Sequence, residues 1–208
     1  MANVSHAALT GSNLHEPKGV AEASANTVYR ADGAGSGDWE APLNLIERRA
    51  LSGLAAEEFT GLSTYRSLWL VVEGWTWSAT STIPIIQFGT SGAYRTSGYL
   101  TSVLNNTTDL LNVTTAGAMI THTLSVDDGF ANVQIMNFNS STHPTSAQSE
   151  SVQCSVNLIG SASSPGTYYR YDCTSIYPTV EAHEKIKVTT TGGTATCSGG
   201  YLTLYGIQ

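Results

Sequence analysis

Apolar and polar residues alternate with a period of two in several segments of the later part of the chain. The alternation is clear in Val133-Gln134-Ile135-Met136-Asn137-Phe138 and recurs at Val152, Cys154, Val156 and Leu158. Because successive side chains of a β-strand point to opposite faces, this pattern predicts strands with one buried face. Residues 65–75 are also rich in aromatic and β-branched residues, which favour strands.

Strand signals of this kind recur between clusters of Gly, Pro, Asn, Asp or Ser. The segments that carry them are 65–75, 83–88, 118–125, 131–139, 151–159, 167–175, 185–190 and 201–207. Many short strands separated by turn signals at a spacing of about 8–15 residues predict an antiparallel sandwich or barrel. We therefore expect residues 43–208 to form an all-β, jelly-roll-like β-sandwich.

Residues 43–59 fit two alternatives. Leu45, Leu51 and Leu54 are tolerated in a short amphipathic helix. Ser52-Gly53 interrupts such a helix after about two turns, which favours two short strands. We predict strands.

Residues 1–42 differ in composition from the rest of the chain. Their large apolar residues are spaced too far apart for a self-contained core, and Gly and Pro are frequent. The segment is therefore either disordered or ordered by burial against another chain. Its specific turn sequence His15-Glu16-Pro17-Lys18-Gly19 and the strand-like Thr27-Val28-Tyr29-Arg30 favour an extended arm that is ordered in an oligomer.

The composition excludes several classes of protein. The chain has 208 residues, of which 41% are hydrophobic and only 12% charged, and its net charge is -7. Nucleic-acid binding rests on Lys and Arg, so nine scattered basic residues argue against it. The hydrophobic content argues against a disordered chain. Since no apolar run approaches about 18 residues, no membrane insertion is expected.

The cysteines and the N-terminus indicate a reducing compartment. Cys154, Cys173 and Cys197 form no Cys-x-x-Cys pair, so neither a zinc site nor a disulfide framework is expected, and small buried thiols are the simpler interpretation. The first residues lack a basic segment followed by an apolar one, so no secretory signal is predicted. Synthesis in a cytoplasm follows.

Motifs for catalysis or cofactor binding are weak. None of the five histidines stands in a metal-binding spacing. His183 lies between Glu181 and Glu184 in what we interpret as a solvated charged turn. The glycines of residues 33–37 lack the Lys-Ser/Thr ending and the helix of a phosphate-binding loop. We predict no catalytic residue, no metal and no cofactor.

Paired carboxylates leave one enzymatic alternative open. Glycoside hydrolysis needs two acids that flank the sugar. Neighbours such as Glu57 and Glu58 point to opposite faces of a strand, and Asp127-Asp128-Gly129 is typical of a turn. A polysaccharide depolymerase would require the fold to bring together distant acids, with Asp127, Asp128, Glu181 and Glu184 as the candidates.

Aromatic residues suggest a binding surface for sugars. Trp75 and Trp77 are two residues apart, so in a strand they share a face, and the hydroxyl-rich residues 78–82 follow them. Tyr168, Tyr169 and Tyr171 alternate between faces, so at least one of them should point outward. Burial in the core is the alternative for both tryptophans. The candidates for glycan contact are Trp75, Trp77 and Tyr169.

Two sets of residues resemble a known class of proteins. Residues 7–20, which include Leu9-Thr10-Gly11-Ser12, and residues 27–39 resemble the N-terminal segment of tailed-bacteriophage virion proteins such as tail-fibre, head-fibre and decoration proteins. Later features are similar to the β-sandwich modules of such proteins. They are Phe59-Thr60-Gly61-Leu62 with Tyr65-Arg66, Thr96-Ser97-Gly98-Tyr99, Ile135-Met136-Asn137-Phe138 and Leu202-Thr203-Leu204-Tyr205-Gly206-Ile207.

The resemblance implies a non-enzymatic structural appendage of a virion, made in the host bacterial cytoplasm. The N-terminal arm would anchor a homotrimer on capsid, collar or tail proteins, and the sandwich would face outward, where host-surface glycans are the candidate contact. A tail-spike depolymerase is the alternative. In a trimer, His6 or His15 from three chains could meet a metal or an anion, although solvated histidines are the ordinary outcome. The expected arm residues are Leu9, Leu14, His15, Pro17, Val20, Val28 and Tyr29.

Overall fold

The computed structural model describes residues 27–31, 37–40, 43–78, 83–105, 108–120, 129–155 and 167–207. The chain divides into two compact units, residues 1–44 and residues 45–208. This division lies two residues from the boundary expected from the sequence. Within the described ranges, no helix is long and apolar enough to cross a membrane.

The described part of the first unit is a β-hairpin. Strand β1 (Val28–Ala31) pairs antiparallel with β2 (Gly37–Glu40), in a register that runs from Val28 opposite Glu40 to Ala31 opposite Gly37. The strand-like segment 27–30 is thus confirmed as a strand.

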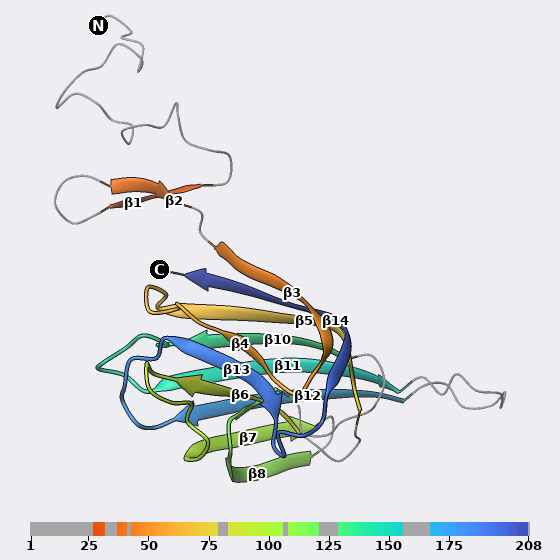
Figure 1. Ribbon diagram of the computed structural model, residues 1–208. Helices are drawn as coiled ribbons and strands as arrows, with labels where there is room; N and C mark the ends of the chain where they lie inside the picture. The colour runs from red at the N-terminus through yellow and green to blue at the C-terminus, as the bar shows by residue number, and fades with distance from the viewer. Residues whose placement is uncertain are drawn as a thin grey trace, which may run out of the picture. The chain divides into compact units, whose positions relative to one another are not determined.

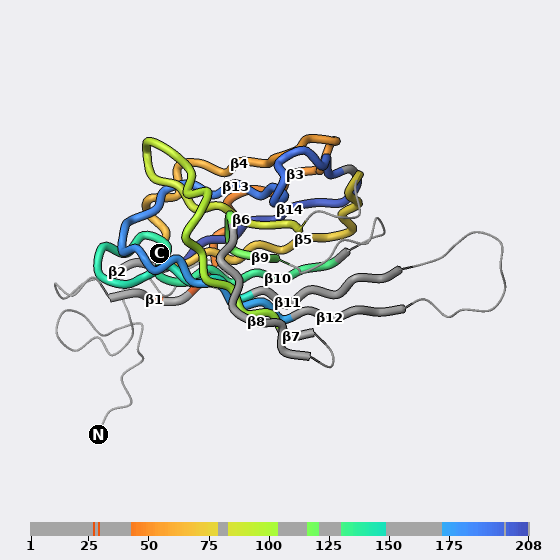
Figure 2. Tube along the Cα trace, turned by 90° about the horizontal axis from the view of Figure 1, so that it is seen from below, coloured from red at the N-terminus to blue at the C-terminus, as the bar shows by residue number. Residues whose placement is uncertain are grey.

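The second unit consists of two packed antiparallel sheets (Figures 1 and 2). The larger sheet has eight strands in the spatial order β3 (Asn44–Leu54), β14 (Cys197–Ile207), β5 (Ser67–Trp77), β10 (Gly129–Met136), β11 (Thr145–Ser155), β12 (Thr167–Tyr177), β7 (Tyr99–Asn105) and β8 (Thr108–Thr115). The smaller sheet has four strands in the order β4 (Glu57–Phe59), β13 (Lys185–Thr190), β6 (Pro84–Gly89) and β9 (Ala118–Met119).

The strand order is that of a jelly roll. Taken along the chain, its eight basic strands are β3, β4, β5, β6, β9, β10, β13 and β14. In space, the first, eighth, third and sixth of these are neighbours in the larger sheet, and the second, seventh, fourth and fifth form the smaller one. The hairpins β7–β8 and β11–β12 extend the larger sheet. The predicted all-β sandwich is therefore confirmed.

The core lies between the two sheets and follows the period-two pattern. Leu68, Leu70 and Val72 of β5 are buried against Ile86 and Phe88 of β6, among other residues of one hydrophobic cluster. A second cluster joins β6 and β9 to β7 and β12, through Ile85, Val103, Met119 and Cys173. The sandwich thus has a hydrophobic core made from its own residues.

The segment 43–59 forms two strands, as predicted, but they are divided at Ala55-Ala56 and not at Ser52-Gly53. Three other strands, β2, β7 and β8, were not predicted. In β7 the side chains of Tyr99, Thr101 and Val103 are all buried. Because the middle one carries a hydroxyl group, the sequence shows no clear alternation of apolar and polar residues in this strand. The predicted strand 118–125 is represented by the two residues of β9, and residues 121–128 lie outside the described part.

An irregularity in β5 changes which of its residues face the core. Buried and less buried positions alternate regularly up to Glu73, two less buried positions follow at Glu73 and Gly74, and the alternation then resumes. Opposite this point, β14 contains Gly199 and Gly200, and Gly74, Gly199 and Gly200 all have positive φ values of 62°, 77° and 75°. This bulge-like distortion shifts the inward phase of β5 by one residue.

Candidate functional site

The tryptophans expected to contact glycans are part of the core. Trp75 and Trp77 are only 2% and 3% exposed, and their rings meet edge to face with centroids 5.6 Å apart. The distortion at Gly74 turns both inward, since regular alternation would have kept them on the face of Trp69 and Val71. The prediction that Trp75 and Trp77 contact glycans is therefore wrong. Tyr169 lies in β12, and its side chain is outside the described part.

The expected arm residues are mostly outside the described ranges. Leu9, Leu14, His15, Pro17 and Val20 all belong to this undescribed group, as does His6. Val28 and Tyr29 lie in β1, where they pair with Glu40 and Trp39 of β2. The anchoring role of these residues stays a prediction.

An aromatic pair does lie on the outer face of the larger sheet. Trp69 of β5 and Tyr205 of β14 are register partners, with ring centroids 6.1 Å apart and ring planes inclined at 44°. Both alternate with buried residues of the core, so their side chains belong to the face turned away from the smaller sheet. Sequence analysis missed this pair, although the alternation of Trp69 with Leu68 and Leu70 was a usable signal.

The aromatic pair begins a row of side chains that crosses the sheet. Trp69 is opposite Gln134 of β10, and Gln134 is opposite Gln148 of β11. Gln148 in turn is opposite Thr174 of β12, which is opposite Ser102 of β7. Both glutamines, the threonine and the serine are exposed. We call this set the cross-strand row; its members in spatial order are Tyr205, Trp69, Gln134, Gln148, Thr174 and Ser102.

The next row on one side is more apolar. Its members include Ile207 beside Ser67, and Met136, Ser146, Ile176 and Leu100 in successive partner strands. Its four large apolar side chains are between 39% and 49% exposed. The outer face of the larger sheet thus exposes an extended apolar surface to solvent. This surface lies beside the exposed, uncharged polar side chains of the cross-strand row.

A pair of charged groups lies at one corner of this face, and a further acid, Asp172 of β12, lies on the same face two residues from Thr174. The guanidinium of Arg48 lies 3.9 Å from the ring centroid of Tyr201, and its Nη2 donates a hydrogen bond of 3.3 Å to Glu73. Tyr201 and Glu73 are register partners, four residues along their strands from Tyr205 and Trp69. The charges of Arg48 and Glu73 are therefore separate from the cross-strand row.

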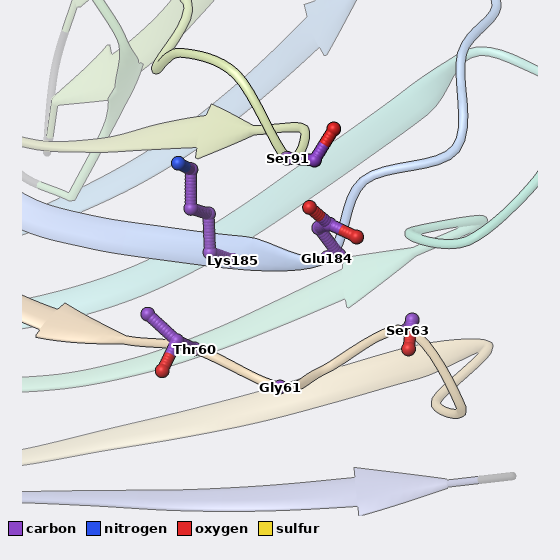
Figure 3. A pocket seen from close by; sticks show the side chains of 6 residues that line it. All are labelled: Thr60, Gly61, Ser63, Ser91, Glu184 and Lys185. Carbon is purple, nitrogen blue, oxygen red and sulfur yellow. The ribbon is translucent and has the colours of Figure 1, made fainter.

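A shallow polar hollow of about 330 Å³ lies at one end of the smaller sheet (Figure 3). Thr60, Gly61 and Ser63 line it from the segment after β4, and Ser91, Glu184 and Lys185 line it from the segments near β6 and β13. No aromatic residue is among these lining residues. Since most ligand sites have apolar or aromatic walls, this hollow is the weaker candidate.

The nearby ring of Tyr94 is covered by cations. The ammonium groups of Lys185 and Lys187 lie 4.7 and 4.4 Å from its centroid. Burial, together with the negative charge of Glu58, raises the pKa of Tyr94 to about 12, so its phenol is neutral. A ring occupied by two ammonium groups is a poorer surface for a sugar than the pair Trp69 and Tyr205.

His183 is a core residue and not part of a solvated turn. It is fully buried, with the rings of Phe88, Phe138 and Tyr177 at centroid distances of 5.3, 5.7 and 5.6 Å. Neither ring nitrogen has a hydrogen-bond partner within the described part of the chain. The interpretation of this segment as solvated is therefore wrong for His183, because the aromatic residues of three other segments enclose its ring.

The carboxylate beside His183 is held by an arginine. Arg95 Nε and Nη2 donate hydrogen bonds of 2.6 and 2.5 Å to the two carboxylate oxygens of Glu181. This bidentate contact lowers the pKa of Glu181. Glu181 Oε1 lies 3.9 Å from His183 Nδ1, and burial lowers the pKa of His183 to about 4 despite the nearby negative charge. At neutral pH Glu181 is therefore an ionised partner of Arg95 and His183 is a neutral core residue, so both side chains have structural roles.

The remaining acids named from the sequence are Glu184, which lines the polar hollow, and Glu57, Glu58, Asp127 and Asp128. Glu57 is buried and accepts a 3.1 Å hydrogen bond from Arg49, while Glu58 is exposed, as expected for neighbours in a strand. Asp127 and Asp128 lie outside the described ranges. No group of three or more His, Cys, Asp and Glu residues that could hold a metal ion is found among the residues that the structure describes.

Two of the three thiols are buried and should be unreactive. Cys173 and Cys197 are each 2% exposed, and burial raises the pKa of both to about 12. Since the thiolate is the reactive form, we expect a Cys154→Ser variant to bind no thiol reagent such as DTNB while folded at pH 8. The same protein should bind two equivalents in guanidinium chloride. Rapid labelling of the folded variant would contradict this prediction.

The outer face of the larger sheet is thus the better candidate for binding, because aromatic rings, amides and hydroxyls lie together in its cross-strand row. No protein-family model, curated protein or solved structure matches this chain.

Proposed function

We propose that this protein is a non-enzymatic structural appendage of a bacteriophage virion. Residues 1–42 anchor a homotrimer on other virion proteins, and the jelly roll faces outward and contacts glycans of the host surface. The observation that carries this proposal is the division of the chain into a small N-terminal unit and a sandwich with a core of its own.

The small unit supports the anchoring role. Its described sheet has two strands of four residues each, and an isolated two-stranded hairpin is marginally stable in water. Burial against other chains is the physical means of ordering such a segment, and cyclic symmetry supplies three equivalent surfaces at once. This argument agrees with the resemblance of residues 7–20 and 27–39 to the N-terminal segments of virion proteins.

The jelly roll supports the outward role. The fold occurs in viral capsid proteins and in lectins, which makes it an argument by analogy of fold only. The independent argument is the outer face of the larger sheet, where Trp69 and Tyr205 lie beside exposed amides and hydroxyls. Such a face suits contact with sugars more than catalysis.

The oligomeric state tests the proposal. Light scattering of the full chain should give about three times the chain mass of 22.0 kDa. A variant with Leu9→Asp, Leu14→Asp and Val20→Asp should be monomeric and keep the unfolding temperature of the sandwich. Leu54→Asp is the matched control, because Leu54 is an exposed leucine of the sandwich, and it should remain trimeric.

A monomeric wild-type chain would overturn the proposal. So would electron microscopy of intact particles without density for the protein. Where density is present, it identifies the anchoring partner as a capsid, collar or tail protein.

A further inference from the structure

We infer that the outer face of the eight-stranded sheet binds an uncharged polysaccharide, whose chain lies across the strands along the cross-strand row. This inference rests on the proposed function, since it names the surface and the ligand class of the host contact. The proposed glycan contact is thus assigned to Trp69 and the other residues of the cross-strand row, in place of the buried Trp75 and Trp77.

The aromatic end of the row supplies apolar contact. The rings of Trp69 and Tyr205 lie on neighbouring strands at a centroid distance of 6.1 Å. Pyranose rings have faces of C–H groups, which pack against aromatic rings as other apolar groups do. The exposed apolar side chains of the next row, such as Met136 and Ile176, widen this surface.

The middle and far end of the row supply hydrogen bonds. Gln134 and Gln148 are register partners, and each primary amide carries two N–H donors and an acceptor oxygen. Thr174 and Ser102 continue the row with hydroxyls that can donate and accept. All four residues are exposed, so sugar hydroxyls can reach them without a rearrangement of the core.

The spacing of the row matches a polymer. Neighbouring strands of a sheet are about 4.8 Å apart, so the side chains from six strands extend over about 24 Å. A row of this length is long enough to contact several successive sugars of one chain. A ligand that crosses the strands meets rings first, then amides, then hydroxyls.

The absence of charged side chains from the cross-strand row indicates the class of ligand. None of its six side chains is an acid, a lysine or an arginine, so it holds no cation for a phosphate or a uronic acid. Nucleic acids depend on such cations for affinity. Arg48, whose guanidinium lies over the ring of Tyr201, is outside the row. An uncharged glycan therefore fits the row better than an acidic one.

Affinity electrophoresis of the full chain tests this inference. The gels would contain dextran, laminarin, galactomannan or arabinoxylan as neutral probes, and alginate as the acidic probe. We expect at least one neutral probe to retard the wild-type chain. Trp69→Ala should weaken that retardation at least tenfold and Trp69→Phe much less. Gln148→Ala, a change at an exposed site, should weaken it at least threefold.

A matched control separates the row from the rest of the face. Phe130 is a 51% exposed aromatic residue of β10 on the same face, opposite Glu73, so Phe130→Ala should leave retardation unchanged. Absence of retardation by all four neutral probes would overturn the inference, as would retardation by alginate alone or an equal loss in Phe130→Ala. A lower solution mass of Trp69→Ala would also overturn it, because the face would then join copies of this chain.

These outcomes are distinct from failure of the proposed function. A trimeric wild-type chain that no neutral probe retards would overturn only the inference. A monomeric wild-type chain that is retarded, and whose retardation requires Trp69, would overturn the trimeric appendage and support the glycan site.

Discussion

Replacement of Gly200 by alanine is expected to lower the free energy of unfolding of the sandwich by about 3 kcal/mol or more. Gly200 has a φ of +75°, and a Cβ there would lie 2.6 Å from both the carbonyl carbon and the carbonyl oxygen of Gly74, and still closer to the carbonyl oxygen of Glu73. These are backbone atoms of the neighbouring strand, so they can give way only if β5 and β14 separate.

Thermal or urea unfolding of Gly200→Ala measures this effect, with a loss of roughly 10 °C in Tm. Gly193→Ala is the matched control. Gly193 also has a positive φ, of +64°, but no atom lies within 4 Å of the position of its Cβ. It should therefore cost only about 1 kcal/mol of backbone strain. Equal losses in the two variants would show that close contact with β5 is not what requires glycine at position 200.

A fall in pH from 7 to 5 is expected to destabilise the folded chain by about 2 kcal/mol through His183 alone. The pKa of this buried imidazole is lowered from its ordinary 6.5 to about 4. Between these two values the unfolded chain binds a proton that the folded chain does not bind. The stabilisation is thus complete above about pH 6.5 and is lost as the pH falls toward 4.

His183→Phe provides the comparison, because it keeps an aromatic ring among Phe88, Phe138 and Tyr177 but removes the titrating group. The other histidines are retained, so the difference in pH dependence between the two proteins isolates His183. Urea unfolding at several values between pH 7 and 5 measures it. The range stops above the ordinary pKa of Glu181, whose lowered pKa adds a further loss in stronger acid. Parallel pH profiles of the two proteins would contradict the prediction.

The distortion at Gly74 and Gly200 links stability to the proposed binding face. It assigns opposite sides of the sheet to tryptophans that are six and eight residues apart in one strand, Trp69 outside and Trp75 and Trp77 inside. Regular alternation would have put all three on one face. A one-residue shift therefore decides which aromatic rings can meet a ligand.

Much of the fold could be predicted from local patterns. Strand β13 has the predicted bounds, 185–190, and the alternation around Val133 and Ile135 marks the buried face of β10. The change in composition near residue 42 lies close to the division between the two units. These features follow from the sequence because period-two burial and turn-forming residues act over a few neighbouring positions.

Local sequence patterns were sufficient to predict the all-β class and most strand positions, and the composition gave the low fraction of charged residues, 12%. The tertiary structure alone decided the phase of β5 after Gly74, the burial of His183 and the assembly of the row from Tyr205 to Ser102. Each of these depends on which distant strands pair and in what register. Such pairings join residues far apart in the chain, so local periodicity carries no record of them.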